Sequence, residues 1–178
     1  MEKAPEKASK GTIEVNDSKL RDILDAEAPI EVLAEGYSWS EGPLWLPDQK
    51  TLIFSDVPMN TIYSWSEDKG AGVYLTPSGF TGENFVGSEP GSNGLTLNNQ
   101  GELVLCQHGN RAVSVMKSDL SNPKPDFQAL AAAFEGKRFN SPNDLIFDRS
   151  GNLYFTDPPY GLPGGMEDSG KELEFQGV

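Results

Sequence analysis

Asn93-Gly94-Leu95-Thr96-Leu97 is the middle one of three similar runs, and the outer two are Glu41-Gly42-Pro43-Leu44-Trp45 and Asn143-Asp144-Leu145-Ile146-Phe147. Each run has an oxygen-bearing side chain four residues before a bulky apolar residue, and the runs recur at a spacing of about fifty residues. Periods of this length are typical of propeller and solenoid architectures, in which equivalent positions of each repeat lie on equivalent surfaces. If the repeats are blades around an axis, Glu41, Asn93 and Asn143 are expected to point at a common centre.

A second apolar run follows each of the first runs, and these second runs begin at Leu52, Leu103 and Leu153. The connections between them are rich in Asn, Asp, Gly and Pro, the residues that short hairpin loops require. Further strands are predicted over residues 61–65 and 72–75 in the first repeat, and over residues 112–116 and 127–130 in the second. The sequence therefore predicts an all-β fold built from four-stranded antiparallel blades, with crossovers at residues 76–92 and 131–142.

The three repeated polar residues have the chemistry of a cation site. One carboxylate, from Glu41, and two amide carbonyls, from Asn93 and Asn143, are hard oxygen ligands that suit Ca²⁺, Mg²⁺ or Mn²⁺. Asn-Gly and Asn-Asp are also common turn dipeptides, so each asparagine taken singly could be a turn residue leading into a strand. The shared position of all three residues within their repeats favours the cation site.

The composition excludes several other kinds of site. The chain of 178 residues has a net charge of −13, which disfavours nucleic acid and anionic membranes as partners. Cys106 and His108 are the only residues of their types, so neither a disulfide within the chain nor a Cys/His zinc cluster can form. Cys106 lies in an apolar strand pattern and is expected to be a small core residue. Apolar runs fall short of the roughly 18 residues that span a membrane.

The N-terminal part is expected to stand apart from the repeats. Residues 1–16 are predicted to be a flexible leader, because they begin with a charged, Ala-rich stretch containing Pro5. Asp17 is expected to cap a short helix over residues 17–29, and residues 30–34 are expected to form a strand. The leader resembles what remains after a secretion signal is removed. A soluble protein is predicted, periplasmic or secreted in that case and otherwise cytoplasmic.

The third repeat is shorter than the other two. After residue 157 comes a Gly- and Pro-rich loop, and residues 172–178 are predicted to begin another strand. A closed propeller needs at least about four blades, whereas this chain supplies two and a half to three. Residues 30–178 are therefore expected to be the N-terminal part of one incomplete propeller domain. The remaining blades would come from further sequence or from a second chain.

With these residues in view, the sequence resembles the senescence marker protein, regucalcin and gluconolactonase family, and its bacterial gluconolactonase branch in particular. The likeness is carried by Glu41-Gly42-Pro43-Leu44-Trp45, Ser92-Asn93-Gly94-Leu95, Cys106-Gln107-His108-Gly109-Asn110-Arg111, Ser141-Pro142-Asn143-Asp144 and Thr156-Asp157-Pro158-Pro159-Tyr160-Gly161-Leu162. The resemblance implies a six-bladed β-propeller of which this chain is the N-terminal half. It also implies hydrolysis of sugar lactones with one divalent cation, Ca²⁺ first, with Mg²⁺, Mn²⁺ or Zn²⁺ as alternatives.

The resemblance also assigns roles to individual residues. Glu41 and Asn143 would be metal ligands, and Asn93 would either join the metal shell or contact the substrate. The general-base Asp of the family belongs to a later blade, beyond Val178, so the chain alone is expected to be inactive. Animal members have an Arg where this sequence has Gly91, which leaves His108 and Arg111 as the residues predicted to contact the substrate.

Three functions remain open from the sequence. A metal-dependent lactonase acting on a small-molecule lactone is the first, because a cation can stabilise the charge that develops on the ring carbonyl oxygen. An esterase or organophosphate hydrolase could use the same site, since fold does not fix substrate. A non-catalytic propeller that binds calcium or a partner is the third alternative.

Overall fold

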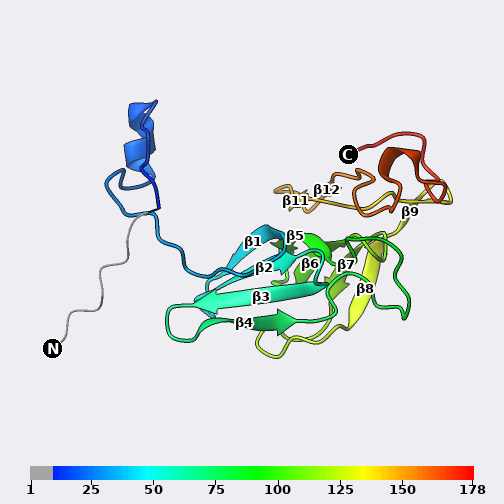
Figure 1. Cartoon of the computed structure of the whole chain (residues 1–178), viewed down its shortest axis with the longest axis horizontal. Helices are drawn as coiled ribbons and strands as arrows, with labels where there is room; N and C mark the ends of the chain where they lie inside the picture. Colours follow the sequence, from blue (N-terminus) through cyan, green and yellow to red (C-terminus); the bar gives the residue numbers. More distant parts are fainter. Residues whose placement is uncertain (1–9) are drawn as a thin grey trace. The chain divides into compact units, whose positions relative to one another are not determined.

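The computed structural model describes residues 10–178, and two four-stranded antiparallel sheets form most of it (Figure 1). The first sheet has the order β1-β2-β3-β4 and the second has the order β5-β6-β7-β8. Their strands are β1 (Ser40–Leu46), β2 (Thr51–Asp56), β3 (Thr61–Ser66), β4 (Gly70–Leu75), β5 (Ser92–Leu97), β6 (Leu103–Gln107), β7 (Ala112–Met116) and β8 (Phe127–Ala131). The predicted four-stranded units are confirmed, because each sheet is an antiparallel meander with short connections.

Two shorter hairpins follow the second sheet. The strands β9 (Ala133–Phe134) and β10 (Lys137–Arg138) form a small hairpin within the predicted crossover, and β11 (Leu145–Phe147) pairs with β12 (Leu153–Phe155). The strand pairing matches the repeats seen in the sequence, since Trp45, Leu97 and Phe147 lie opposite Leu52, Leu103 and Leu153. The third repeat therefore starts with the same hairpin as the other two.

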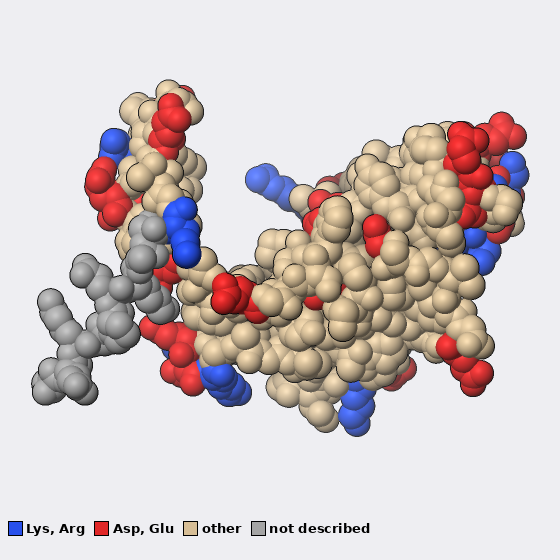
Figure 2. Space-filling model, in the orientation of Figure 1, with Lys and Arg blue, Asp and Glu red and all other residues tan. Residues whose placement is uncertain are grey.

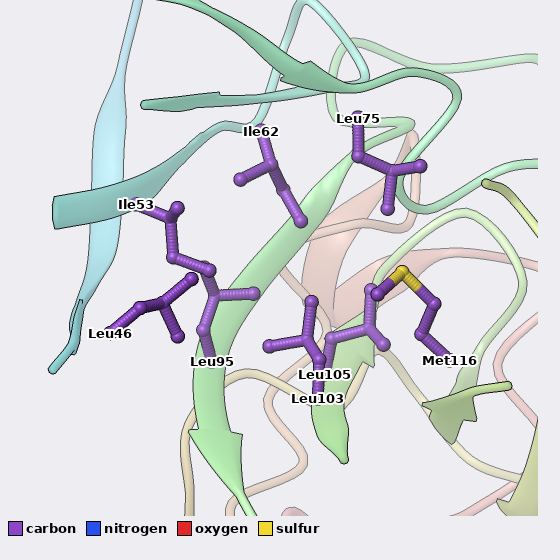
Figure 3. Close-up of a cluster of buried hydrophobic side chains, with 8 residues drawn as sticks. All are labelled: Leu46, Ile53, Ile62, Leu75, Leu95, Leu103, Leu105 and Met116. Atoms are coloured by element: carbon purple, nitrogen blue, oxygen red, sulfur yellow. The ribbon is translucent and has the colours of Figure 1, made fainter. Parts of the chain in front are cut away.

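The main core lies between the two large sheets. Side chains from β1 to β4 meet side chains from β5 to β7, and Figure 3 shows them converging: Leu46, Ile53, Ile62, Leu75, Leu95, Leu103, Leu105 and Met116. A second cluster, formed by Val104, Cys106, Val113, Val115 and Leu145, joins the other face of the second sheet to β11. Each fully buried Leu or Ile contributes about 1.5–3 kcal/mol, so these contacts stabilise the packing of the two sheets against each other and of β11 against the second sheet.

The residues before the sheets form a separate unit, which ends at Glu35. Only the 3-10 helix η1 (Ser18–Asp22) is present in residues 10–35, so the helix predicted over residues 17–29 is much shorter than expected. Asp17 does cap it, because its side chain accepts a hydrogen bond from the Lys19 amide. Part of the predicted leader, residues 1–9, lies outside the described residues.

Two predicted strands are absent from the structure. Residues 30–34 join no sheet in the described chain, and Val32 and Leu33 remain 46% and 44% exposed. Residues 172–178 also form no strand, and they are held by single hydrogen bonds instead of a ladder. The carbonyl of Gly177 accepts from the Asp157 amide, and that of Phe175 accepts from the Asn140 side chain. A short 3-10 helix, η2 (Gly165–Glu167), precedes this segment.

The charged side chains are spread over the surface. On the face shown in Figure 2, acidic side chains form several separate groups, and Lys and Arg side chains are scattered among them. Within residues 10–178, no helix has the length and apolar character needed to cross a membrane.

Candidate metal centre

One pocket of about 540 Å³ is lined by all three repeated polar residues, Glu41, Asn93 and Asn143. Glu41 lies in β1, Asn93 lies in β5, and Asn143 lies two residues before β11. The strands β1 and β5 are neighbours in Figure 1, and β5 also contacts β11. The other lining residues are Trp39, Val57, Ser88, Glu89, Pro159, Tyr160, Leu162, Pro163, Gly165 and Met166. Residues that are far apart in the sequence thus share one cavity.

A bulge occurs in each of the first two inner strands at the position of the polar residue. In β1 it lies between Glu41 and Leu44, and in β5 it lies between Ser92 and Leu95. A bulge inserts one extra residue into a strand and changes the direction of the side chains beside it. The interruption of the ladder therefore allows Glu41 and Asn93 to face the pocket while the strand beyond packs into the core.

Glycine follows the polar residue in the first two repeats because the next inner strand passes close by. A Cβ on Gly42 would lie 2.2 Å from the carbonyl oxygen of Asn93, and Gly42 also has a positive φ of 54°. The hydroxyl of Ser55 donates to the same carbonyl oxygen at 2.8 Å. The backbone at Asn93 is thus held from two sides, which positions its side chain at the pocket wall.

Two buried aspartates at equivalent places hold the segments that lead into the inner strands. The carboxylate of Asp56, the last residue of β2, accepts from the amides of Ser38 and Trp39 at 2.9 and 3.1 Å. The carboxylate of Asp157, after β12, accepts from the Asn140 amide at 2.8 Å. Burial raises the pKa of Asp157, although hydrogen bonds from backbone amides act in the opposite direction. Both aspartates fix the chain about three residues before a pocket residue.

The three pocket residues differ in their hydrogen bonds. Glu41 Oε1 accepts from the indole Nε1 of Trp39 at 2.8 Å. Asn143 Nδ2 lies 3.3 Å from His108 Nε2. Asn93 is only 7% exposed, and no side chain or backbone group within residues 10–178 bonds to its carboxamide. Since Asn93 lines the pocket, its carboxamide is available to a molecule or ion bound there.

His108 and Arg111 do not line the pocket, although the sequence predicted that both contact the substrate. His108 is 1% exposed, and its Nδ1 lies 3.0 Å from Glu89 Oε2. Arg111 is 8% exposed, and it donates from Nε to the carbonyl of Phe139 and from Nη1 to that of Gly170. In this structure Arg111 connects two loops, and His108 contacts the pocket only through Glu89 and Asn143.

Several pocket residues were not predicted from the sequence. Trp39 lies just outside the repeated run, and Glu89 lies in a crossover that has no periodic pattern. Tyr160 comes from the loop after β12, and Met166 comes from η2. The Gly- and Pro-rich loop itself was a signal for Tyr160, because binding residues often lie on loops.

The donor set of the pocket fits a hard divalent cation. Residues 10–178 contain no cluster of three or more His, Cys, Asp or Glu side chains that could hold a metal by themselves. In the pocket, however, two of the three repeated residues are asparagines, whose carboxamide oxygens Ca²⁺ and related cations accept readily. The carboxamide of Asn93, which bonds to no group of the described chain, is therefore free to act as such a donor.

An all-β fold of four-stranded antiparallel sheets, with an oxygen-lined pocket where successive inner strands meet, defines the class of protein. The chain belongs to the family described as the SMP-30/Gluconolactonase/LRE-like region, whose model matches residues 39–176. The resemblance seen in the sequence is therefore confirmed.

Individual proteins similar to this chain are also described as gluconolactonases. A gluconolactonase of Zymomonas mobilis is 42% identical over 170 residues, which are 94% of this chain and 47% of that protein. The structure of a Xanthomonas campestris gluconolactonase has a TM-score of 0.75 at 30% identity, over 97% of this chain and 54% of its own. A further structure, provisionally described as a gluconolactonase, has the same TM-score at 32% identity. The chain spans about half the length of these relatives.

Proposed function

We propose that the protein to which this chain contributes hydrolyses a sugar lactone with the help of one divalent cation. Glu41, Asn93 and Asn143 would hold the cation, with Ca²⁺ as the first choice. The proposal rests mainly on one observation, which is that three side chains from three repeats line the same pocket. The names of the relatives support lactone as the substrate class and do not favour the ester, organophosphate or non-catalytic alternatives.

The proposal extends to the architecture. In it, the two large sheets are the first two blades of a six-bladed propeller, and β11 and β12 begin the third. The relatives are about twice as long as this chain, which supports the presence of further blades in the active protein. These blades would close the open side of the pocket.

In the proposed reaction, the pocket residues bind the cation, and the pocket accommodates the lactone. The cation, when bound, would supply electrostatic stabilisation of the charge that develops on the lactone carbonyl oxygen. Asn93 and Asn143 are neutral, so they would bind it without reducing its charge as additional carboxylates would. Trp39 holds Glu41 by one carboxylate oxygen, and this leaves the other oxygen for the cation. A pocket of about 540 Å³ has room for a monosaccharide lactone, since small-molecule sites occupy roughly 300–1,000 Å³.

The general base is not assigned to residues 1–178. The reaction needs a carboxylate that removes a proton from the attacking water, and we expect it in a later blade. Residues 1–178 alone are therefore expected to bind the cation without catalysing turnover.

A chimera tests the proposed function. Residues 1–178 would replace the matching half of the Zymomonas mobilis gluconolactonase, and opening of gluconolactone would be followed as acid release. We expect activity that is lost on chelation and restored by Ca²⁺. Glu41→Gln and Asn143→Ala should each abolish most of it. Full activity after either substitution, or after chelation, would reject the site.

Matched controls show whether an effect comes from losing a pocket ligand or from the same substitution made anywhere in the chain. Glu67 and Asn99 are exposed and lie outside the pocket, so Glu67→Gln and Asn99→Ala should keep the activity of the chimera. A panel of lactones, simple esters and organophosphates, assayed with the same preparation, identifies the substrate class. Faster turnover of an ester or organophosphate than of any lactone would contradict the proposal.

A further inference from the structure

We propose that Glu89 and His108 are positioning residues that set the orientation of the Asn143 carboxamide, so that its Oδ1 faces the pocket. The imidazole of His108 stands between the other two side chains. Its Nδ1 is 3.0 Å from Glu89 Oε2, and its Nε2 is 3.3 Å from Asn143 Nδ2. The role of Asn143 as a cation ligand rests on the function proposed above, whereas the order of these hydrogen bonds does not.

The imidazole is held in place by its surroundings. The backbone of His108 is fixed on both sides, because its amide donates to the carbonyl of Gly91 and its carbonyl accepts from the Arg111 amide. A Cβ on Gly161 would lie 2.8 Å from the His108 Cβ, so the loop after β12 packs directly against the histidine. With 1% exposure, the ring has no room to turn towards water.

With Glu89 ionised and His108 neutral, the donors and acceptors can be assigned in only one consistent order. An ionised carboxylate only accepts hydrogen bonds, so His108 Nδ1 must carry a proton towards Glu89. In the neutral imidazole, Nε2 is then an acceptor, and it requires a donor from Asn143. The carboxamide of Asn143 therefore presents Nδ2 to His108, and Oδ1 takes the opposite direction. Asn143 lines the pocket, so Oδ1 is the atom available to a cation there.

The opposite hydrogen-bond order would remove the Asn143 oxygen from the proposed cation site. If His108 Nε2 carried the proton, Asn143 would have to turn over and offer Oδ1 to the ring, and Nδ2 would then face the cation. An amide nitrogen carries two hydrogens and cannot act as a ligand. Partners of this kind behind a metal ligand typically change metal affinity about 10- to 100-fold.

A nitrogen NMR measurement tests the arrangement without any metal. His108 is the only histidine in the chain, so labelling histidine with ¹⁵N gives one pair of ring signals without overlap. In the metal-free protein we expect a protonated Nδ1 and an unprotonated Nε2. Glu89→Ala should remove this preference, and a signal from protonated Nε2 should appear. A protonated Nε2 in the unsubstituted protein, or an unchanged spectrum in Glu89→Ala, would overturn the proposal.

A calorimetric titration with Ca²⁺ alone tests the consequence for binding. Replacing His108 by Ala should weaken Ca²⁺ binding about 10- to 100-fold, and Asn143→Ala should weaken it at least as much. Ser114→Ala is the control, since it removes another buried hydrogen bond, to Gln107, that lies outside the pocket. Equal Ca²⁺ affinity in His108→Ala and the unsubstituted protein would overturn the positioning role. If the unsubstituted protein binds no Ca²⁺, the proposed cation site fails, while the NMR measurement still decides the hydrogen-bond order.

Discussion

The backbone amide of Gly94 donates a hydrogen bond to the carbonyl oxygen of Asn143 at 2.7 Å. The amide belongs to the second repeat and the carbonyl to the third, and each lies at or beside a pocket residue. One repeat earlier, the backbone of Gly42 lies close to the carbonyl oxygen of Asn93, without a hydrogen bond between the two. The pocket residues are thus positioned by direct contacts between successive inner strands, in addition to packing of the sheets.

Side chains at these two glycines should damage the structure. A Cβ on Gly94 would lie 2.8 Å from the Asn143 carbonyl oxygen, and one on Gly42 would lie 2.2 Å from that of Asn93. Gly94→Ala is expected to lower the free energy of unfolding by about 1–3 kcal/mol, as overpacking does. Gly42→Ala should cost more, because its positive φ adds about 1–2 kcal/mol. Urea unfolding measures both. Gly72→Ala, where a Cβ has open space, is the control and should change stability little.

Replacing Arg111 by Lys should destabilise the loops beyond the second sheet. The guanidinium donates to two carbonyls, those of Phe139 and Gly170, and a single ammonium group cannot reproduce this fork. We expect a loss of about 1–3 kcal/mol in unfolding free energy and faster proteolysis near residue 170. Ca²⁺ affinity should stay close to that of the unsubstituted protein. A large loss of affinity with unchanged stability would instead support the contact with ligand that the sequence predicted.

Asp157 should make a measurable contribution to the pH dependence of stability. Burial raises its pKa in the folded protein above the usual value of about 3.9, so the native state binds the proton more tightly than the unfolded state. The contribution of Asp157 to stability therefore falls as pH rises from about 4 through the raised pKa. Asp157→Asn stays neutral and removes this dependence. The stability of the variant relative to the unsubstituted protein should rise with pH over that range, and a difference that falls with pH would contradict the assignment.

Cys106 should react slowly with thiol reagents in the native protein. Its side chain is completely buried in the cluster with Val104 and Val113, and burial raises the pKa of its thiol well above the ordinary value. Little thiolate is present at pH 8, and the reagent cannot reach it. Labelling with a chromogenic disulfide should be complete within the mixing time in urea and much slower in buffer. Rapid labelling of the folded chain would show that the second sheet opens readily.

Much of the sheet structure could be predicted because its signals are local. The connections at residues 47–50 and 148–151 carry the turn residues that hairpins need, and the strands around them have the predicted pairing. Residues 30–34 and 172–178 have similar apolar patterns without becoming strands. A strand also needs a neighbour to complete its hydrogen bonds, and the pattern within one segment contains no information about that neighbour.

The grouping of three side chains around one pocket also follows from a repeated pattern, whereas their roles remain predictions. Glu41, Asn93 and Asn143 occur at a repeated position, so the period itself indicated that they would come together. Glu89 lies in a crossover outside the period, and its contact with His108 depends on how the loops fold. The hydrogen bonds that Asp56 and Asp157 accept from backbone amides could not be predicted either. The sequence shows a repeated aspartate, but it does not show which amides lie near it.

The central claim is that Glu41, Asn93 and Asn143 bind one cation, and Tb³⁺ binding to the 178-residue chain tests it most directly. Tb³⁺ is a hard cation that can take the place of Ca²⁺, and its luminescence is excited by a nearby indole. Trp39 is in the required place, because its Nε1 donates to Glu41 Oε1. Trp39→Phe should lower the luminescence, and calorimetry of the same variant measures how far the loss of its hydrogen bond to Glu41 changes Tb³⁺ affinity.

We predict strong Tb³⁺ luminescence on excitation of tryptophan, with one equivalent bound and displacement by Ca²⁺. Glu41→Gln, Asn93→Ala and Asn143→Ala should each weaken binding at least tenfold, whereas Glu67→Gln should leave it unchanged. Luminescence that persists with equal affinity after all three pocket substitutions, or that is absent from the unsubstituted chain, would contradict the account.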